Sequence, residues 1–264
     1  MPIINKLFAG YESLGFTVSS GLNPHHHGGN LGAPFTWLLK DGRSFSNGLG
    51  ISMKEIYFLE CLFEEFRPRN AFVIGNSFGW STLAIGLLNP DARVLAIDAG
   101  FDENSLEGLD VTNRLGGALG LNVVAVQAVS PEGVDGAVTE HLSSPIDFCF
   151  IDGLHTNEQV FKDFAALKPH MSDDGVFLFH DVISCDLAPG IARIAEACGK
   201  APEVLYGTSS GMAILCLGND RTLARTLATF RGDTGAINLI RRQQRPKVHR
   251  LLSRWRRSIA KRIG

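Results

Sequence analysis

The sequence predicts an α/β protein in which a doubly wound sheet of seven strands carries helices on both faces. From residue 71 onward, short apolar segments alternate with segments of helical period, a pattern typical of a mostly parallel sheet. Two final apolar segments flank the loop 207–211 and predict a terminal antiparallel hairpin. Strands are expected at 71–75, 93–97, 122–127, 146–151, 176–180, 203–206 and 212–217, and helices at 52–66, 81–88, 106–119, 132–142, 156–168 and 189–199.

Composition divides the chain into three regions. Residues 1–50 are rich in Gly, Asn and His with little periodicity, so we expect an irregular N-terminal segment there, with a lid as one role for it. Residues 51–220 carry the alternating pattern and form the main domain, and residues 221–264 are expected to be a helical extension. At 264 residues with 45% hydrophobic content, the chain can bury a substantial core.

Composition also indicates the compartment. No apolar run reaches the length of a membrane span, and the N-terminus lacks the basic and apolar parts of a signal peptide. The five cysteines have no Cys-x-x-Cys spacing and are expected to be buried and reduced. These features predict a cytoplasmic protein.

The first helix of the main domain, expected at 52–66, has one apolar face. Ile56, Leu59, Phe63 and Phe66 recur at helical spacing and are expected on one face of this helix. Glu55 and its neighbour Lys54 precede this face and are expected to be solvated.

The segment 71–82, AFVIGNSFGWST, is the most informative motif. Its apolar start predicts a buried strand, and Gly75 and Gly79 allow the backbone to turn sharply and approach a ligand. Ser81 and Thr82 are expected to cap the following helix, whose free N–H groups attract an anionic group.

The next strand, expected at 93–97, ends in Asp98, 23 residues after Gly75. An acidic residue at this position is placed to accept hydrogen bonds from the two hydroxyls of a ribose. A Gly-rich loop alone is a weak signal, but the loop and the acid together indicate an adenosine-containing ligand.

Acidic residues and histidines follow two later strands. Asp152 and His155 follow the strand at 146–151, and His180 and Asp181 follow the strand that begins near 176. If the two strands are neighbours, as chain order suggests, two carboxylates and two imidazoles converge on one cleft. Burying such groups costs several kcal/mol unless they are paired or bound to something, so a functional site is expected there.

Together these segments resemble a class I S-adenosylmethionine-dependent methyltransferase, in the small-molecule O-methyltransferase-like group. The resemblance is carried by VIGNSFGWST, LAID, FIDGLHTNEQVFKDF and GVFLFHDV, and it covers about residues 50–218. It implies a Rossmann-like fold with a terminal hairpin, S-adenosylmethionine as cofactor, and methyl transfer to a hydroxyl of a small molecule such as a sugar or natural product. Two positions depart from the family pattern: Val73 stands where an acid is usual, and Asn157 where Tyr is common.

The resemblance also implies roles for individual residues. Asp98 binds the ribose, Ser130 borders the adenine, and Asp152 lies at the cofactor as well as at the catalytic site. The residues expected around the methionine part of the cofactor are Gly75, Asn76, Ser77, Gly79 and Ser81.

In metal-dependent members of this broad group, the ligands come from the ends of the fourth and fifth strands. By position, those ligands are Asp152, His180 and Asp181. His155 is then the candidate base, and the expected catalytic residues are His155, His180 and Asp152. Mg²⁺ prefers oxygen ligands, so an imidazole favours Mn²⁺, Fe²⁺ or Zn²⁺. A hydrogen-bonded pair of His180 and Asp181 without a metal is the other interpretation, and both stay open.

Two functions of other classes remain. Gly75-Asn-Ser77-Phe-Gly79 fits the nucleophile elbow of a serine hydrolase, with His27 in an oxyanion-type loop and Ser77 followed by Asp152 and His180 in the expected order. That hypothesis gives Asp98 no role, and the methyltransferase interpretation is favoured. The other alternative is a cofactor-binding relative without transfer activity.

The C-terminal segment is strongly basic. Residues 241–264 hold ten Lys/Arg and no Asp/Glu, and 247–263 have the pattern of a basic amphipathic helix. Packing on the domain or on a second subunit is favoured, which leaves a homo-oligomer open, and peripheral membrane contact is the second possibility. Nucleic-acid binding is disfavoured because the rest of the chain is acidic. A flexible loop is favoured over a metal site for the run 25–27, three histidines.

Overall fold

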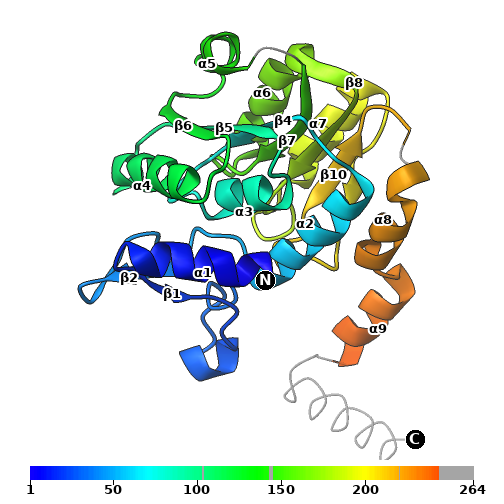
Figure 1. Cartoon of the computed structure of the whole chain (residues 1–264). Helices are drawn as coiled ribbons and strands as arrows, with labels where there is room; N and C mark the ends of the chain where they lie inside the picture. The colour runs from blue at the N-terminus through cyan, green and yellow to red at the C-terminus, as the bar shows by residue number, and fades with distance from the viewer. Residues whose placement is uncertain (103, 143–144, 220, 244–264) are drawn as a thin grey trace, which may run out of the picture.

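The computed structural model describes residues 1–102, 104–142, 145–219 and 221–243. Its main sheet has seven strands in the order β6-β5-β4-β7-β8-β10-β9, with β10 antiparallel to both of its neighbours (Figure 1). The strands are β4 (Asn70–Ile74), β5 (Arg93–Asp98), β6 (Val123–Gln127), β7 (Ile146–Ile151), β8 (Met171–Phe179), β9 (Glu203–Val204) and β10 (Ala213–Cys216). The predicted doubly wound sheet and its terminal hairpin are confirmed.

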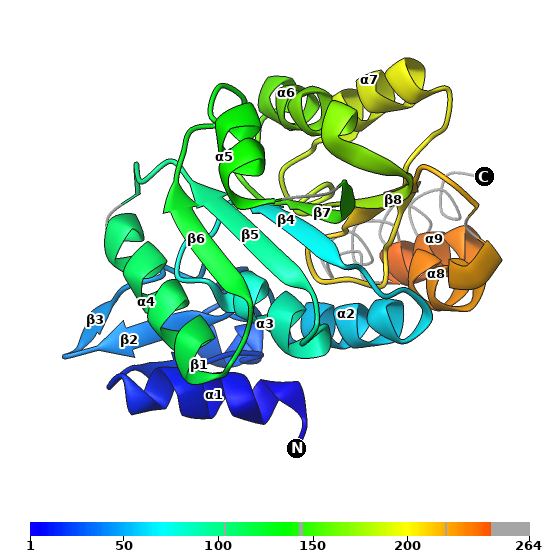
Figure 2. The same cartoon turned by 45° about the horizontal axis from the view of Figure 1, so that its top comes forward.

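Helices cover both faces of this sheet. Helices α2, α3, α4 and α8 lie on one face with the N-terminal α1, and α5, α6 and α7 lie on the other (Figure 2). The helices are α1 (Ile3–Ser13), α2 (Met53–Glu65), α3 (Trp80–Leu88), α4 (Ser105–Ala118), α5 (Val134–His141), α6 (Asn157–Leu167), α7 (Ala188–Cys198), α8 (Ala224–Arg231) and α9 (Thr234–Gln243).

The alternation of side chains along each strand explains the two layers of core. In β4, Phe72 and Ile74 belong to the core under α5–α7, whereas Ala71 and Val73 belong to the core under α2–α4. Every residue of β4 is buried, as expected for a central parallel strand covered on both faces.

The register of the parallel strands places their ends at one edge of the sheet. Ile74 pairs with both Ile97 and Ile151, and Ile151 pairs with Phe179. The residues that follow these positions therefore gather at the same edge. They include Gly75, Asp98, Asp152 and His180.

The expectation that residues 1–50 are irregular is wrong. They contain α1 and a three-stranded antiparallel sheet, which Figure 1 shows on the same side of the main domain. Its strands are β1 (Thr17–Ser19), β2 (Trp37–Lys40) and β3 (Arg43–Ser44). Ile3, Leu7 and Tyr11 recur every four residues and are buried in the main core, so α1 is stabilised by packing that the local composition does not reveal.

The start of the predicted C-terminal extension is helical. Phe230 of α8 packs edge-on against Phe58 of α2, with ring centroids 5.0 Å apart, so α8 is attached to the main domain. The predicted basic amphipathic helix at 247–263 lies outside the described residues. Among the helices that the structure describes, none is long and apolar enough to cross a membrane.

Candidate active site

The loop after β4 depends on a glycine at its first position. Gly75 has a φ of 91°, in the left-handed region, and a Cβ atom there would overlap the backbone carbonyl of Asp152. The backbone of this loop therefore lies directly against the end of β7. This contact joins the predicted cofactor loop to the predicted catalytic cluster.

Asp98 holds the same loop from the end of β5. Its Oδ2 accepts a hydrogen bond from the backbone N–H of Ser77 at 2.7 Å, and its Oδ1 accepts one from Gly100 N–H at 2.9 Å. Ser77 has a φ of 46°, an uncommon value for a residue other than glycine. Non-glycine residues in this conformation cluster at functional sites.

The expected capping of α3 by Ser81 or Thr82 is wrong. The N-cap is Gly79, with a φ of 78° and no capping side chain, and Thr82 instead donates a hydrogen bond to Asn76 Oδ1 at 3.0 Å. The Asn76 amide group in turn donates to Thr112 Oγ1 at 3.0 Å. The side chain of Asn76 thus ties the loop together from inside, a role that spacing alone does not show.

A cavity of about 510 Å³ lies along the carboxyl edge of the sheet. The predicted site residues that line it are Gly75, Ser77, Asp98, Ser130, Asp152, His155, His180 and Asp181. Asn76 and Ser81 line a separate small pocket, and Gly79 is in neither lining. Phe35 and Leu49, from the N-terminal region, also line the large cavity.

The lining of the cavity includes a buried carboxyl group on α6, that of Asp163. Asp163 Oδ1 accepts hydrogen bonds from Ser130 Oγ at 2.5 Å and from Gln159 Nε2 at 2.7 Å. Burial raises the pKa of Asp163, although these two hydrogen bonds act to lower it. Ser130, which the resemblance places at the adenine, is therefore fixed by a helix that follows it in sequence.

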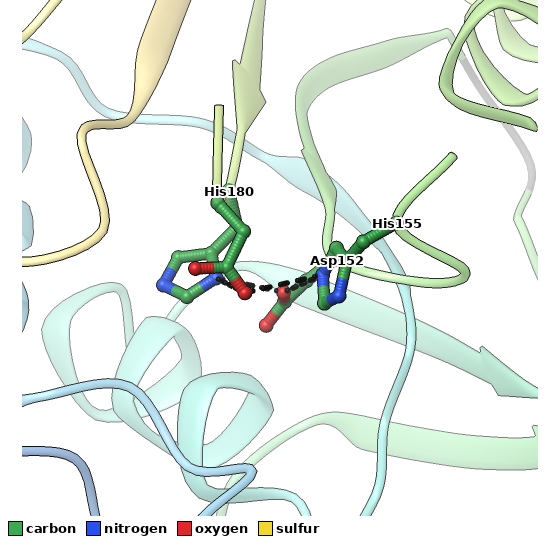
Figure 3. Close-up of side chains that lie close together, drawn as sticks. Asp152, His155 and His180 are labelled. Atoms are coloured by element: carbon green, nitrogen blue, oxygen red, sulfur yellow. Dashed lines mark hydrogen bonds and ion pairs between the residues drawn. The ribbon is translucent and has the colours of Figure 1, made fainter. Parts of the chain in front are cut away.

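The ends of β7 and β8 bring the four predicted catalytic and metal-binding residues together. Figure 3 shows three of them, Asp152, His155 and His180. Asp152 Oδ1 lies 3.1 Å from His155 Nε2 and 2.9 Å from His180 Nδ1. Asp181 Oδ2 lies 3.5 Å from His155 Nε2 and 3.4 Å from His180 Nδ1. Both carboxylates thus face both imidazoles, as the strand order predicts.

Opposite charges stabilise one another within this cluster. Burial would lower the pKa of His180, but the carboxylates of Asp152 and Glu55 outweigh it and raise that pKa well above its usual range. Burial would raise the pKa of Asp181, but the neighbouring imidazoles lower it to about 2. The pKa of His155 is raised by Asp152 and Asp181 despite its partial burial.

A fifth residue of the cluster was missed by sequence reasoning. Glu55 is expected to be solvated but is fully buried, and its Oε2 lies 3.4 Å from His180 Nε2. Burial would raise the pKa of Glu55, yet the charge of His180 and several hydrogen bonds lower it to about 2. The sequence does contain the capping-box pattern Ser52-x-x-Glu55. This pattern predicts where a helix begins, but it does not predict whether the glutamate is buried by other parts of the chain.

The cluster has the donor set of a divalent cation site. One ligand atom from each of Asp152, His155, His180 and Asp181 lies within 4.8 Å of the others. Both ring nitrogens of His180 are buried, and neither makes a well-aligned hydrogen bond in spite of the nearby carboxylates. A mixed set of nitrogen and oxygen donors suits Mn²⁺, Fe²⁺ or Zn²⁺ better than Mg²⁺.

The geometry does not support the serine hydrolase hypothesis. The contacts of the His155 and His180 ring nitrogens described above are with carboxylates, and Ser77 is held in the loop through its backbone N–H. Asp98, which has no role in a hydrolase, anchors that N–H.

The central part of the chain matches a known protein family. Residues 72–182 match the model of a family described as a methyltransferase domain. A search of curated proteins found no match.

Several solved structures share the fold. The O-methyltransferase TomG from Streptomyces achromogenes, involved in tomaymycin synthesis and in complex with S-adenosylmethionine, is 15% identical and covers 65% of this chain and 83% of its own, with a TM-score of 0.51. An O-methyltransferase from Bacillus cereus in complex with S-adenosylhomocysteine is 19% identical and covers 63% and 82%, with a TM-score of 0.50. CalS11, a TDP-rhamnose 3'-O-methyltransferase of calicheamicin biosynthesis, is 17% identical and covers 63% and 80%, with a TM-score of 0.52.

Proposed function

We propose that the protein is a class I S-adenosylmethionine-dependent methyltransferase that transfers the cofactor's methyl group to a hydroxyl of a small molecule, on the premise that residues 72–182 match a methyltransferase domain. The observation that carries the proposal is the shared cavity. One cavity of about 510 Å³ joins the Asp98 loop, which suits a nucleoside, to the Asp152–His155–His180–Asp181 cluster, which suits a hydroxyl acceptor.

Methyl transfer requires no covalent bond between the protein and the substrates. The sulfonium of the cofactor is already activated, so the protein must align the acceptor oxygen with the methyl group and exclude water. In our proposal, Asp98 binds the ribose hydroxyls and Ser130 lies beside the adenine. The methionine part then runs along the Gly75–Ser77 backbone toward Asp152, which places the methyl group near the cluster.

The acceptor hydroxyl also has to lose its proton. His155 is the more accessible imidazole of the cluster, with 30% of its side chain exposed against 4% for His180. We assign it as general base, because the carboxylates of Asp152 and Asp181 lie beside its Nε2 and would stabilise the imidazolium that forms when it takes the proton. A divalent cation held by Asp152, His180 and Asp181 would lower the pKa of the acceptor hydroxyl.

The lining of the cavity is partly apolar. Phe35, Leu49, Phe101 and Leu154 line it, and Phe101 and Leu154 are 83% and 68% exposed. Exposed apolar side chains at a cavity suit an acceptor that carries an apolar ring or chain beside its hydroxyl. Natural products and their attached sugars combine these features, and the names of TomG and CalS11 support that class.

Calorimetric titration with S-adenosylmethionine and S-adenosylhomocysteine tests the cofactor, with Asp98→Ala as the variant. We expect micromolar binding to the wild type and none to Asp98→Ala, because the variant loses both the ribose ligand and the anchor of Ser77 N–H. A panel of hydroxylated natural products and nucleotide sugars, assayed with labelled methyl donor, then tests transfer. No cofactor binding would overturn the proposal, whereas binding without transfer to any acceptor would favour the cofactor-binding relative.

A further inference from the structure

We propose that Glu55 is a positioning residue that orients His180 so that its Nδ1 serves as a cation ligand beside Asp152 and Asp181. The inference rests on the proposed function, since it concerns the cluster where the acceptor hydroxyl would be held. It adds a residue that lies outside the matched domain segment, 72–182, and that belongs to α2 rather than to the carboxyl edge of the sheet.

The Glu55 carboxylate is fixed from two directions. Its Oε2 accepts a hydrogen bond from the backbone N–H of Ser52 at 2.9 Å, which closes the capping box of α2. Its Oε1 accepts a hydrogen bond from the backbone N–H of Ser210 at 2.8 Å, in the loop between β9 and β10. Neither donor depends on a side chain, so the carboxylate position is set by the fold itself.

The ring of His180 lies between this carboxylate and the cluster. Its Nε2 is 3.4 Å from Glu55 Oε2, and its Nδ1 is 2.9 Å from Asp152 Oδ1. Phe35 and Phe150 pack edge-on against the same ring, with centroids 6.2 Å and 5.8 Å away. A half-turn of the ring would place carbon atoms against the carboxylates on both sides, so this orientation is strongly favoured.

Helix capping alone does not account for Glu55. A capping-box glutamate needs only to reach back to its N-cap backbone, and it can do so at the surface. Burying a carboxylate costs several kcal/mol unless an opposite charge compensates it. The ion pair that the structure records for Glu55 is the one with His180.

The arrangement has a chemical consequence for His180. A histidine that binds a cation through one ring nitrogen carries its proton on the other nitrogen, commonly opposite a carboxylate. With a cation bound, Glu55 opposite Nε2 would favour the ring proton there, and the lone pair of Nδ1 would be free for the cation beside Asp152 and Asp181. Glu55 on α2 and His180 after β8 would form a carboxylate–histidine–cation series if a cation were bound at Nδ1.

The test compares Glu55→Gln with Ser52→Ala by titration with Mn²⁺ and with Zn²⁺. Gln is nearly the same size, but it removes the charge and must turn its NH₂ group toward Ser210 N–H or toward Ser52 N–H and His180. Ser52→Ala weakens the same capping box without changing the carboxylate at His180. We expect Glu55→Gln to weaken cation affinity about 10- to 100-fold and Ser52→Ala to change it less than about 3-fold.

Binding of S-adenosylhomocysteine separates this inference from the proposed function and also reports folding. Retained cofactor affinity in Glu55→Gln with weakened cation affinity supports the inference. Equal cation affinities in Glu55→Gln and Ser52→Ala, or a wild type that binds the cofactor but neither cation, overturn it. Absence of cofactor binding by the wild type instead overturns the proposed function.

If Glu55→Gln does not fold, Glu55→Asp replaces it. That variant keeps the negative charge at the start of α2 but draws the carboxylate back by one methylene group, away from His180. We expect the same loss of cation affinity, and a Glu55→Asp protein with wild-type cation affinity overturns the inference.

Discussion

The hydroxyl of Tyr11 donates a hydrogen bond of 2.6 Å to the carbonyl oxygen of Phe78, 67 residues further along the chain. Tyr11 lies on α1, is fully buried, and also packs its ring against Trp80 at the start of α3. Phe78 belongs to the loop that Asp98 holds from the opposite side through Ser77. The N-terminal helix is thus part of the support of the cofactor loop.

We expect Tyr11→Phe to lower the free energy of unfolding by about 1–3 kcal/mol, because the buried carbonyl of Phe78 loses its donor. Urea denaturation measures this change. Ser13→Ala is the matched control on the same helix, since the Ser13 hydroxyl forms a 2.6 Å bond at the surface. If Tyr11→Phe and Ser13→Ala had the same free energy of unfolding, the buried hydrogen bond from Tyr11 to Phe78 would contribute little to stability.

Gly75→Ala should abolish cofactor binding. The new Cβ would overlap the carbonyl of Asp152, and alanine strongly disfavours a φ of 91°. The loop must therefore move away from the end of β7, and we expect S-adenosylhomocysteine affinity to fall more than about 100-fold, or about 2.7 kcal/mol, by calorimetry. Gly136→Ala in α5 is the control, because nothing lies within 4 Å of its added Cβ. Unchanged affinity in Gly75→Ala would contradict the close contact between loop and strand.

His155→Gln tests the assignment of the general base. Loss of a positioned base lowers the rate of transfer by about 10²- to 10⁴-fold, whereas cofactor affinity should be kept, as calorimetry would show. The rate is measured with the acceptor that the panel identifies. His170→Gln is the control, since His170 pairs with Asp135 at the surface and does not line the cavity. A variant of His155 with wild-type kcat would move the base to another residue.

Asp163 should make stability depend on pH. Its pKa is raised by burial, so the folded protein binds a proton there more tightly than the unfolded chain, whose Asp has a pKa of about 3.9. The wild type therefore loses stability as the pH rises from about 4 through the raised pKa. Asp163→Asn stays neutral, and we expect it to gain stability relative to the wild type over that range.

Urea denaturation at several pH values between 4 and 7 measures the effect of Asp163→Asn. Asp91→Asn, at an exposed position, should follow the wild-type curve. An Asp163→Asn curve parallel to that of the wild type would show that this carboxyl does not titrate differently in the folded state.

Local pattern was sufficient for the main sheet. The strand expected at 146–151 is found as Ile146–Ile151, and the others agree within a few residues, with β8 beginning five residues earlier than expected at Met171. Buried parallel strands are continuous apolar runs, and this signal lies within each segment. The convergence of Asp152, His155, His180 and Asp181 followed from the same pattern, because parallel neighbours end at one edge of a sheet.

The local sequence pattern did not predict contacts between segments that are distant in the sequence. Glu55 and His180 are 125 residues apart in the sequence. The Ser52-x-x-Glu55 motif predicts where α2 begins, but it is the same whether Glu55 is exposed to solvent or buried under another segment. Likewise, α1 has few apolar side chains, and its stability comes from their packing in the main core. That packing is not visible in the local sequence.

The sequence by itself therefore determined the order of strands and helices in the main domain, the edge where the site lies, and the chemical types that meet there, since these depend on short-range periodicity and on strand ends. Only the tertiary structure decided which buried charge faces His180, how α1 supports the cofactor loop, and that Gly79 rather than Ser81 caps α3. The physical reason is that burial and ion pairing depend on the surfaces that long-range packing brings together, and no local pattern encodes them.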